Sequence, residues 1–448
     1  MFERPRSGER AVLVRLGIGT PLDPEDLGEF TQLAISAGAV PVATLTGRRE
    51  RPDPRYFVGS GKAEEIRLEA LAHEADLILV DHPLSPSQER NLEKLTGRRV
   101  LDRSGLILDI FAQRAKSHEG KLEVELAQLK HIASRLVRGW THLERQRGGG
   151  IGLRGPGETQ LETDRRLLAK RVRVLSARLE RIKQQRETGR GARAAIPVPS
   201  LALVGYTNAG KSTLFRTLSG DQSTYVADQL FATLDPTVRR LRLPGGTQVV
   251  VADTVGFIRD LPHELVAAFQ STLTEAREAT LLLHVIDASD PRRAEHIAEV
   301  ERVLADIGAD GIPGIRVYNK IDRLEDAPRI DRDEHGAAAA VWISAARDQG
   351  LELLAGAIAE RLSRSVRRVR VQLPLAAGAA RARLYAAGVV QAERTTGEAF
   401  DLDLDLPDAE LAALLGEPGA KLVPAMGDTL EFTGNDAPSF AGMTVTNA

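Results

Sequence analysis

The chain has 448 residues, of which 42% are hydrophobic and 27% are charged, and its net charge is −2. This length predicts about three domains, and the composition is typical of a globular protein with buried cores. The absence of cysteine excludes disulfides and cysteine-ligated metal centres. No apolar run approaches the roughly 18 residues of a membrane span, and the N-terminal residues lack the apolar core of a secretory signal. We therefore expect a cytoplasmic protein without a membrane anchor.

Residues 1–117 alternate short apolar runs with helical patterns, which predicts a small α/β domain with a parallel sheet. Strands are expected at residues 12–14, 40–42, 56–58, 77–80 and 100–101. Helices are expected at residues 27–37 and 62–73, and a third after the capping candidate Ser87. The short turn at 59–62 superficially resembles a nucleotide loop, but it lacks the spacing of one, so we interpret it as a structural turn or a surface phosphate contact.

Residues 118–195 predict two long helices joined by a glycine-rich tip. Apolar residues recur every three or four positions from 122 to 143, and every seven positions from 161 to 182. This pattern is typical of an antiparallel coiled-coil hairpin, whose arms would be roughly 35–45 Å long. Residues 148–157 hold six glycines and Pro156, so we expect them to be non-helical. We expect residues 188–200 to be a linker.

The hairpin is the basic part of the chain. Residues 121–193 hold 18 Lys and Arg against 8 Asp and Glu, a net charge of +10, so the other residues together carry −12. A charged helix face is often only a solvated surface, but bare glycine-rich backbone with arginines can approach a phosphate backbone closely. We therefore expect RNA contact at the tip. The candidate residues are Arg145, Arg147, Gly149, Gly150, Arg154, Gly155 and Gly157.

Residues 196–365 contain a phosphate-binding loop between an apolar strand at 201–204 and a helix that begins near Thr213. The glycines let successive backbone N–H groups point inward, and the helix N-terminus adds a partial positive charge. We expect Lys211 to contact the β- and γ-phosphates and Ser212 to ligate Mg²⁺. The loop residues are Gly205, Tyr206, Thr207, Asn208, Ala209, Gly210, Lys211 and Ser212.

A second motif, Asp253-Thr254-Val255-Gly256, follows the apolar strand at 249–252. An aspartate at this place holds Mg²⁺ through water, and the backbone N–H of the glycine contacts the γ-phosphate. The expected switch lies between the two motifs, at residues 228–237, and it must supply a threonine to the metal. Thr224, Thr233 and Thr237 all qualify by spacing.

Two further motifs predict the base. The strand at 315–318 leads to Asn319-Lys320-Ile321-Asp322, and the strand at 341–343 leads to Ser344-Ala345-Ala346. A carboxylate at Asp322 can accept two hydrogen bonds from guanine, whereas adenine offers no such pair of donors. The backbone of the second loop suits the guanine O6 atom. Four motifs in order, each after an apolar strand, predict a GTPase.

Phe257 stands where Ras-like enzymes place the glutamine that orients water. Because phenylalanine cannot hydrogen-bond the nucleophile, we expect slow unaided hydrolysis and stimulation by a partner or a cation. We hypothesise that the side-chain oxygen of Asn208 helps to hold K⁺ near the phosphates. The alternative is that Asn208 only caps a turn.

Residues 366–448 predict a small α+β domain, with strands at 366–373 and 399–406 and a short helix at 408–415. No chemical motif occurs in it. The whole chain is therefore predicted to be a multidomain α/β protein, in which a small α/β domain and a helical hairpin precede the P-loop GTPase domain and the α+β domain follows it.

Together these residues resemble the HflX family of ribosome-associated GTPases. The most specific match is residues 149–166, and residues 56–65, 101–104 and 107–115 match as well, as do the GTPase motifs. The resemblance implies that the switch threonine on Mg²⁺ is Thr233, within Phe231-Ala232-Thr233-Leu234-Asp235. It also implies that Lys211, Thr233 and Gly256 support hydrolysis, and that a hydrophobic residue after Gly256 is a family trait.

Members of the family bind the large ribosomal subunit, and some separate stalled ribosomes, notably under heat stress, with the hairpin tip in ribosomal RNA. Some members also bind ATP through the N-terminal domain. The resemblance implies a GTP/GDP switch on the large subunit; we expect a monomer. The alternative is a ribosome assembly or anti-association factor that binds RNA and in which hydrolysis only times release. A membrane-linked GTPase has no visible anchor, and a P-loop kinase would leave Asn319 and Asp322 unexplained.

Overall fold

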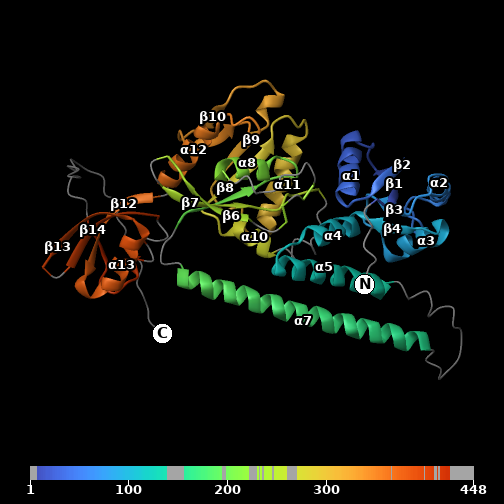
Figure 1. The fold of residues 1–448 in the computed structure, drawn as a ribbon, viewed down its shortest axis with the longest axis horizontal. Helices are drawn as coiled ribbons and strands as arrows, with labels where there is room; N and C mark the ends of the chain where they lie inside the picture. The colour runs from blue at the N-terminus through green and yellow to red at the C-terminus, as the bar shows by residue number, and fades with distance from the viewer. Residues whose placement is uncertain are drawn as a thin grey trace, which may run out of the picture. The chain divides into compact units, whose positions relative to one another are not determined.

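The computed structural model describes residues 8–138, 156–193, 198–220, 230–231, 233–234, 237–244, 247–259, 270–364, 366–397, 399–407, 411 and 414–423. The chain divides into two compact units, one of residues 1–194 and 198–362 and one of residues 195–197 and 363–448. The first unit contains a four-stranded sheet, a helical hairpin and a seven-stranded sheet, and the second contains another four-stranded sheet (Figure 1). The division into four domains stays a prediction.

The N-terminal sheet is parallel, with the strand order β2-β1-β3-β4. Alternate residues of β1 point to opposite faces: Leu13 packs with α1 and α4, whereas Val12 and Val14 pack with α2 and α3. The predicted α/β domain is confirmed. Its elements are β1 (Arg10–Ile18), α1 (Pro24–Ser36), β2 (Val40–Arg49), α2 (Ser60–Ala72), β3 (Leu77–Val80), α3 (Pro86–Thr96), β4 (Arg99–Asp102) and α4 (Arg103–Arg114).

Two predictions for this sheet are wrong. Residues 56–58 form no strand, because Phe57 has a φ of 65° and makes only an isolated bridge with Asp53, after which α2 begins. Helix α3 is capped by Ser85 rather than Ser87. The Ser85 hydroxyl accepts from the Gln88 N–H, and the Gln88 side chain accepts from the Ser85 N–H, a reciprocal capping box that the spacing allowed.

The hairpin consists of α5 (His118–Arg138) and α7 (Pro156–Arg193), which run side by side in Figure 1. Their seam is formed by Leu122, Leu126, Leu175 and Leu179. The lengths, 21 and 38 residues, correspond to about 31 and 57 Å. Residues 156–157 were predicted to be non-helical and residues 188–193 to belong to a linker. Both predictions are wrong, because these residues form the two ends of α7. A proline is tolerated in the first turn because its missing N–H has no partner there.

The seven-stranded sheet has the order β10-β11-β9-β8-β5-β7-β6, in which β6 and β10 are antiparallel to their neighbours and the other pairs are parallel. The order changes direction at β5, and the loops after β5, β7, β8 and β9 therefore meet at one edge. The elements are β5 (Ser200–Val204), α8 (Lys211–Ser219), β6 (Thr237–Arg242), β7 (Gln248–Asp253), α10 (Gln270–Arg277), β8 (Leu281–Asp287), α11 (Arg293–Asp306), β9 (Gly314–Asn319), η1 (Ile321–Arg323), β10 (Arg329–Arg332), β11 (Ala338–Trp342) and α12 (Leu351–Arg364).

The second unit is an antiparallel sheet of order β13-β14-β12-β15, with α13 packed on one face. The leucines of β14 alternate with aspartates, so Leu402 and Leu404 enter the core, while Asp403 pairs with Arg370 on the opposite face. The two predicted strands are confirmed. The elements are β12 (Val366–Pro374), η2 (Leu375–Ala377), α13 (Gly378–Ala387), β13 (Val390–Thr396), β14 (Ala399–Pro407) and β15 (Lys421–Val423).

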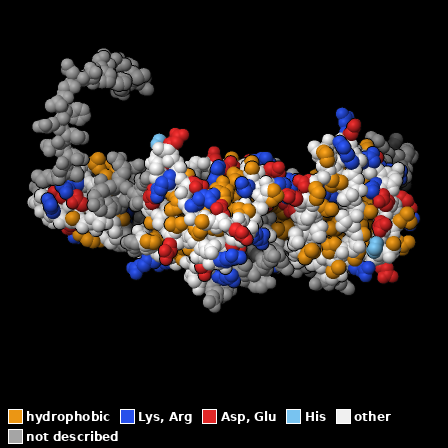
Figure 2. All heavy atoms as spheres, turned by 90° about the horizontal axis from the view of Figure 1, so that it is seen from above, with side chains coloured by type: hydrophobic (Ala, Val, Ile, Leu, Met, Phe, Trp, Pro, Cys, Tyr) orange, Lys and Arg blue, Asp and Glu red, His pale blue; other side chains and the backbone are white. Residues whose placement is uncertain are grey.

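The surface drawn in Figure 2 intersperses acidic and basic side chains. Within the described ranges, no helix combines the length and apolarity that crossing a membrane would require.

Candidate nucleotide site

The loop between β5 and α8 has a backbone that two glycines make possible. Gly205 has a φ of 152°, and a Cβ atom there would lie 2.2 Å from the carbonyl oxygen of Val285. Gly210 has a φ of 96°, and a Cβ atom there would lie 2.2 Å from Nδ2 of Asn319. Both positions therefore require glycine. The loop is pressed against the strand ends that carry the other motifs.

Lys211, at the start of α8, is fully enclosed by this loop. Its ammonium group donates to the carbonyl oxygens of Gly205, at 3.0 Å, and Tyr206, at 2.7 Å. Burial lowers the pKa of Lys211 to about 8, although the nearby carboxylate of Asp253 favours the charged form. A negatively charged phosphate beside this group would favour its charged form and raise its pKa again.

Three oxygen atoms converge below the loop. The hydroxyl of Ser212 lies 2.8 Å from that of Thr233 and 2.7 Å from Oδ2 of Asp253, and Thr233 lies 2.8 Å from the same carboxylate oxygen. Burial raises the pKa of Asp253, and its Oδ1 is buried without a hydrogen-bond partner. An all-oxygen set with an unsatisfied carboxylate oxygen suits Mg²⁺. We call these three residues the metal corner.

The structure brings one of the three candidate switch threonines to the metal corner. Thr233 lies there, whereas Thr237 begins β6 and Thr224 lies outside the described residues. Of the other expected switch residues, Phe231 and Leu234 are buried. Ala232 and Asp235 also lie outside the described residues.

Residues at the end of β9 are hydrogen-bonded to the phosphate loop. Asn319 donates to the carbonyl oxygen of Ala209 and accepts from the N–H of Ala345, both at 3.0 Å. Lys320 has a φ of 66°, and its ammonium group donates to the carbonyl oxygen of Asn208 at 2.7 Å. Ile321 is buried in the fold. The third and fourth motifs therefore meet the first one, as their positions after adjacent parallel strands predict.

Asp322 lies at the rim of this arrangement, with a half-buried carboxylate. Its Oδ1 accepts from the hydroxyl of Ser344 at 2.6 Å, and Arg347 Nε is 3.9 Å from Oδ2. Ser344 and Ala345 are buried and Ala346 is exposed. One oxygen of the carboxylate is therefore hydrogen-bonded to a serine. The other oxygen is partly exposed to solvent, so a nucleotide base could bind to it in place of water.

The segment after β7 closes on the phosphate loop through its backbone. Thr254 is buried and donates to the carbonyl oxygen of Leu203 at 2.6 Å. Phe257 donates its N–H to the Gly205 oxygen at 3.1 Å and accepts from the Thr207 N–H at 2.7 Å. A Cβ atom at Gly256 would lie 2.8 Å from the Thr207 side chain and 3.1 Å from Nζ of Lys211. Glycine is therefore required for this close approach, and Val255 beside it is buried.

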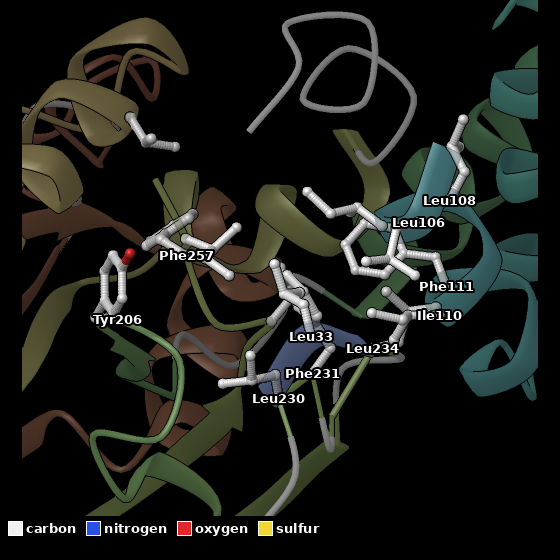
Figure 3. Close-up of a cluster of buried hydrophobic side chains, with 14 of the residues drawn as sticks. Leu33, Leu106, Leu108, Ile110, Phe111, Tyr206, Leu230, Phe231, Leu234 and Phe257 are labelled. Atoms are coloured by element: carbon white, nitrogen blue, oxygen red, sulfur yellow. The ribbon is translucent and has the colours of Figure 1, made fainter. Parts of the chain in front are cut away.

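Phe257 is wholly buried and belongs to the apolar cluster of Figure 3, with Tyr206, Leu230 and Phe231. Its ring therefore packs as a core residue. This placement agrees with the expectation that Phe257 cannot orient water.

A network of buried charges was not foreseen from the sequence. Asp26 of α1 pairs with Arg259 and Arg292, each at 2.6 Å, and with Arg15 of β1. The hydroxyl of Tyr206 donates to Glu29 of α1. These contacts join the phosphate loop and the segment after Phe257 to the N-terminal sheet. The partners are more than 170 positions apart in most pairs, and no local pattern reveals such pairs.

Of the seven residues predicted to contact RNA, Gly157 alone is among the described residues. Arg145, Arg147, Gly149, Gly150, Arg154 and Gly155 lie outside the described residues. Gly157 is in the first turn of α7.

The fold and the four motifs define a P-loop GTPase. Three family models match: a GTP-binding GTPase N-terminal domain over residues 24–112, a GTP-binding GTPase middle region over residues 114–193, and a 50S ribosome-binding GTPase domain over residues 200–320. Proteins called GTPase HflX are similar along most of the chain. That of Escherichia coli (strain K12) is 57% identical over 394 residues, covering 88% of this chain and 92% of the relative.

A second relative, the GTPase HflX of Caldanaerobacter subterraneus subsp. tengcongensis, is 47% identical over 374 residues, covering 84% of this chain and 85% of the relative. The chain therefore belongs to the HflX family of GTPases and hydrolyses GTP. Among solved structures, a GTP-binding protein of the archaeon Sulfolobus solfataricus in complex with GDP aligns with a TM-score of 0.42 and 25% identity, covering 78% of this chain and 97% of that one.

Proposed function

We propose that this GTPase is a switch that binds the large ribosomal subunit in its GTP form, separates stalled ribosomes and leaves after hydrolysis. The observation that carries the proposal is the convergence of Ser212, Thr233 and Asp253 within 2.8 Å. Thr233 comes from a separate segment, so its position can report whether a γ-phosphate and its metal are present. The matching family model, described as a 50S ribosome-binding GTPase, supports the partner.

In this proposal each described residue of the site has one role. The loop from Gly205 to Ser212 cradles the phosphates, with Lys211 on the β- and γ-phosphates and the N–H of Gly256 on the γ-phosphate. Ser212 and Thr233 would ligate Mg²⁺ directly, and Asp253 would hold it through water. An ion held there would supply charge neutralisation for the phosphates. Asn319 orders the loop, Asp322 accepts from guanine, and the backbone at 344–346 contacts O6.

We further propose that the hairpin tip contacts ribosomal RNA. The described part of α7 exposes a basic surface that includes Arg166, Lys170 and Arg173, and the whole segment 121–193 carries a net charge of +10. Positive charge along a long helical hairpin favours a polyanionic partner. Because Phe257 cannot position water, the subunit or a cation at Asn208 stimulates the otherwise slow hydrolysis.

Sedimentation of the protein with ribosomes tests the switch. We expect co-sedimentation with the large subunit in a non-hydrolysable GTP analogue, little in GDP, and a rise in free subunits with GTP. Lys211→Ala should abolish both effects. If Lys211→Ala still separates subunits, the alternative of an RNA-binding anti-association factor is the better account.

The tip has its own test. Arg147→Ala together with Arg154→Ala should weaken subunit binding and flatten its salt dependence without changing basal hydrolysis. The control is Arg302→Ala with Arg316→Ala, two exposed arginines, on α11 and β9, that pair with Glu299 and Glu301. An equal salt slope in both double variants would argue against RNA contact at the tip.

A further inference from the structure

The residues that flank Thr233 are held by the N-terminal region. Phe231 is 2% exposed, and its ring meets that of Phe111 edge-on, with centroids 4.7 Å apart and an interplanar angle of 89°. The N–H of Leu230 donates to the Ser36 hydroxyl, in the last turn of α1, at 3.1 Å. Figure 3 shows Leu230, Phe231 and Leu234 beside Leu33, Ile110 and Phe111.

The backbone at Phe231 is strained. Its φ of 56° lies in the left-handed region, which bulky residues rarely adopt because the Cβ atom approaches the following carbonyl oxygen. Such a conformation persists only where the surroundings over-determine it. Here the surroundings are the Phe111 ring on α4 and the apolar cluster around it. The N-terminal region therefore supplies the packing that keeps this backbone conformation.

The strained residue is two positions before the metal corner. Thr233 itself is only half-buried, and its hydroxyl is 2.8 Å from Ser212 and from Asp253. On either side of it, Phe231 and Leu234 point into the cluster, so the threonine between them projects the opposite way, toward Ser212. Loss of the Phe231 anchor would free the threonine to leave the metal corner.

We propose that Phe111 is a positioning residue for the GTP state: its ring fixes Phe231, and through it Thr233, at the metal corner. The inference rests on the proposed role of Thr233 as a metal ligand. In P-loop GTPases the switch threonine meets the metal when the γ-phosphate is present. The N-terminal region thus completes the triphosphate site, whereas GDP binding depends on the phosphate loop and the guanine side alone.

The test compares GTP-analogue and GDP affinities by displacement of a fluorescent nucleotide at several Mg²⁺ concentrations. For Phe111→Ala we expect a loss of about tenfold in affinity for the analogue, equal to about 1.4 kcal/mol, with GDP affinity unchanged within about twofold. Half-saturation of analogue binding should also need more Mg²⁺. The same pattern, weaker, is expected for Phe111→Leu, which keeps the apolar volume but removes the aromatic edge contact.

The matched control is Phe57→Ala. Phe57 is also a buried phenylalanine of the N-terminal region, between β2 and α2. It belongs to the apolar cluster on the opposite face of the sheet, which holds no switch residue among those that the structure describes. Phe57→Ala should lower thermal stability without changing the ratio of analogue to GDP affinity. If Phe57→Ala changes that ratio as much as Phe111→Ala, the effect is general destabilisation and the proposal is overturned.

Two further variants distinguish a failure of the Phe111 proposal from a failure of its premise, the role of Thr233 as a metal ligand. Combining Phe111→Ala with Phe231→Ala should cost no more than either change alone, because both remove one contact. Thr233→Ala should reduce analogue affinity and its Mg²⁺ dependence. If Thr233→Ala does so and Phe111→Ala does not, the positioning role of Phe111 is wrong. If neither does, the assignment of Thr233 to the metal fails instead.

Discussion

Arg259 donates a hydrogen bond from Nη1 to Oδ1 of Asp26 across 2.6 Å and so ties the segment after Phe257 to helix α1. The same carboxylate oxygen accepts from Arg292, and the other oxygen pairs with the buried Arg15. Burial by itself raises the pKa of Asp26, but the hydrogen bonds from Arg259 and Arg292 outweigh it and leave the pKa below its ordinary value. One carboxylate is therefore shared by three arginines, of which Arg15 also pairs with Asp81 and Arg292 with Glu25.

Replacement of this carboxylate should be costly. We expect Asp26→Asn to lower the free energy of unfolding by about 1.5–3 kcal/mol, because the variant loses charge-assisted hydrogen bonds to Arg15, Arg259 and Arg292. The loss is limited because Arg15 keeps its ion pair with Asp81 and Arg292 keeps its ion pair with Glu25. Urea denaturation measures it. Asp23→Asn is the matched control. Asp23 is the partly exposed cap of α1 and lies 3.6 Å from Arg292. Because asparagine caps equally well, the change should be within about 0.5 kcal/mol. Similar small losses in both variants would contradict the role given to Asp26.

The contribution of Asp26 to the free energy of unfolding should depend on pH in the acidic range. Because the pKa of Asp26 is lower in the folded protein than its ordinary value of 3.8, its stabilising effect is present above that value. The effect is lost as the pH falls below 3.8 through the folded pKa. Unfolding free energies measured across this acidic range should fall less steeply for Asp26→Asn than for the unaltered protein. Parallel curves would show that Asp26 does not titrate in this way.

Lys211 should make nucleotide binding dependent on protons. Without nucleotide the pKa of Lys211 is about 8, and the charge of a bound phosphate should raise it. At a pH at which Lys211 of the free protein has lost its proton, GDP binding should therefore be accompanied by proton uptake. Calorimetry in buffers of different ionisation enthalpy should show more uptake at about pH 8.5 than at about pH 6.5. Correspondingly, the nucleotide-free protein should gain stability as the pH rises from about 8 toward 10.5. Equal uptake at both pH values would exclude this assignment.

The base preference should follow Asp322. An amide in place of the carboxylate can accept one hydrogen bond and donate another, which suits xanthine better than guanine. We expect Asp322→Asn to shift preference from GTP toward xanthosine triphosphate, measured by competition for a labelled nucleotide. The control is Asp326→Asn, four residues on, where the carboxylate pairs with Arg329 at the surface and accepts from the Ala327 N–H. Undiminished GTP preference in Asp322→Asn would refute the guanine contact.

Restoring the Ras-like glutamine at Phe257 should not restore fast hydrolysis. The Phe257 side chain is wholly buried among apolar residues. A glutamine amide at this position would therefore lose its contact with water and gain no hydrogen-bond partner from the apolar side chains around it. We expect Phe257→Gln to cost about 2–4 kcal/mol of stability and to leave single-turnover GTP hydrolysis no faster. Acceleration would mean that the side chain can turn toward the nucleotide.

The cation hypothesis for Asn208 predicts faster hydrolysis in KCl than in NaCl at equal ionic strength, and loss of that difference in Asn208→Ala. Asn208 has a φ of 59° in the loop, so the alanine variant is also strained. Asn208→Gly, which relieves the strain, therefore has to show the same loss of K⁺ dependence. Equal rates in both salts for the unaltered protein would reject the cation and leave Asn208 as a turn residue.

Local pattern was enough to predict most elements, since it depends on neighbours along the chain. Alternating apolar runs predicted β1, β3, β4, β12 and β14, and heptad spacing predicted the α5–α7 seam. The loops that carry the four predicted motifs meet because each follows a buried parallel strand, and such strands end at one edge. Errors arose where two local signals compete. Ser85 and Ser87 can both cap a helix, and the structure uses Ser85. The glycines near the ends of α7 indicated non-helical backbone, but the helix continues through them.

Short motifs in the chain are therefore enough to predict phosphate, metal and guanine contacts, because the chemistry of each ligand dictates the residue types that can bind it. What holds the predicted switch depends on contacts that form only in the folded protein. Phe231 meets Phe111, Arg259 meets Asp26 and Tyr206 meets Glu29 across 120 to 233 positions of the chain. Packing and ion pairing between such distant residues depend on how the two sheets dock. No period or motif in either partner encodes that geometry.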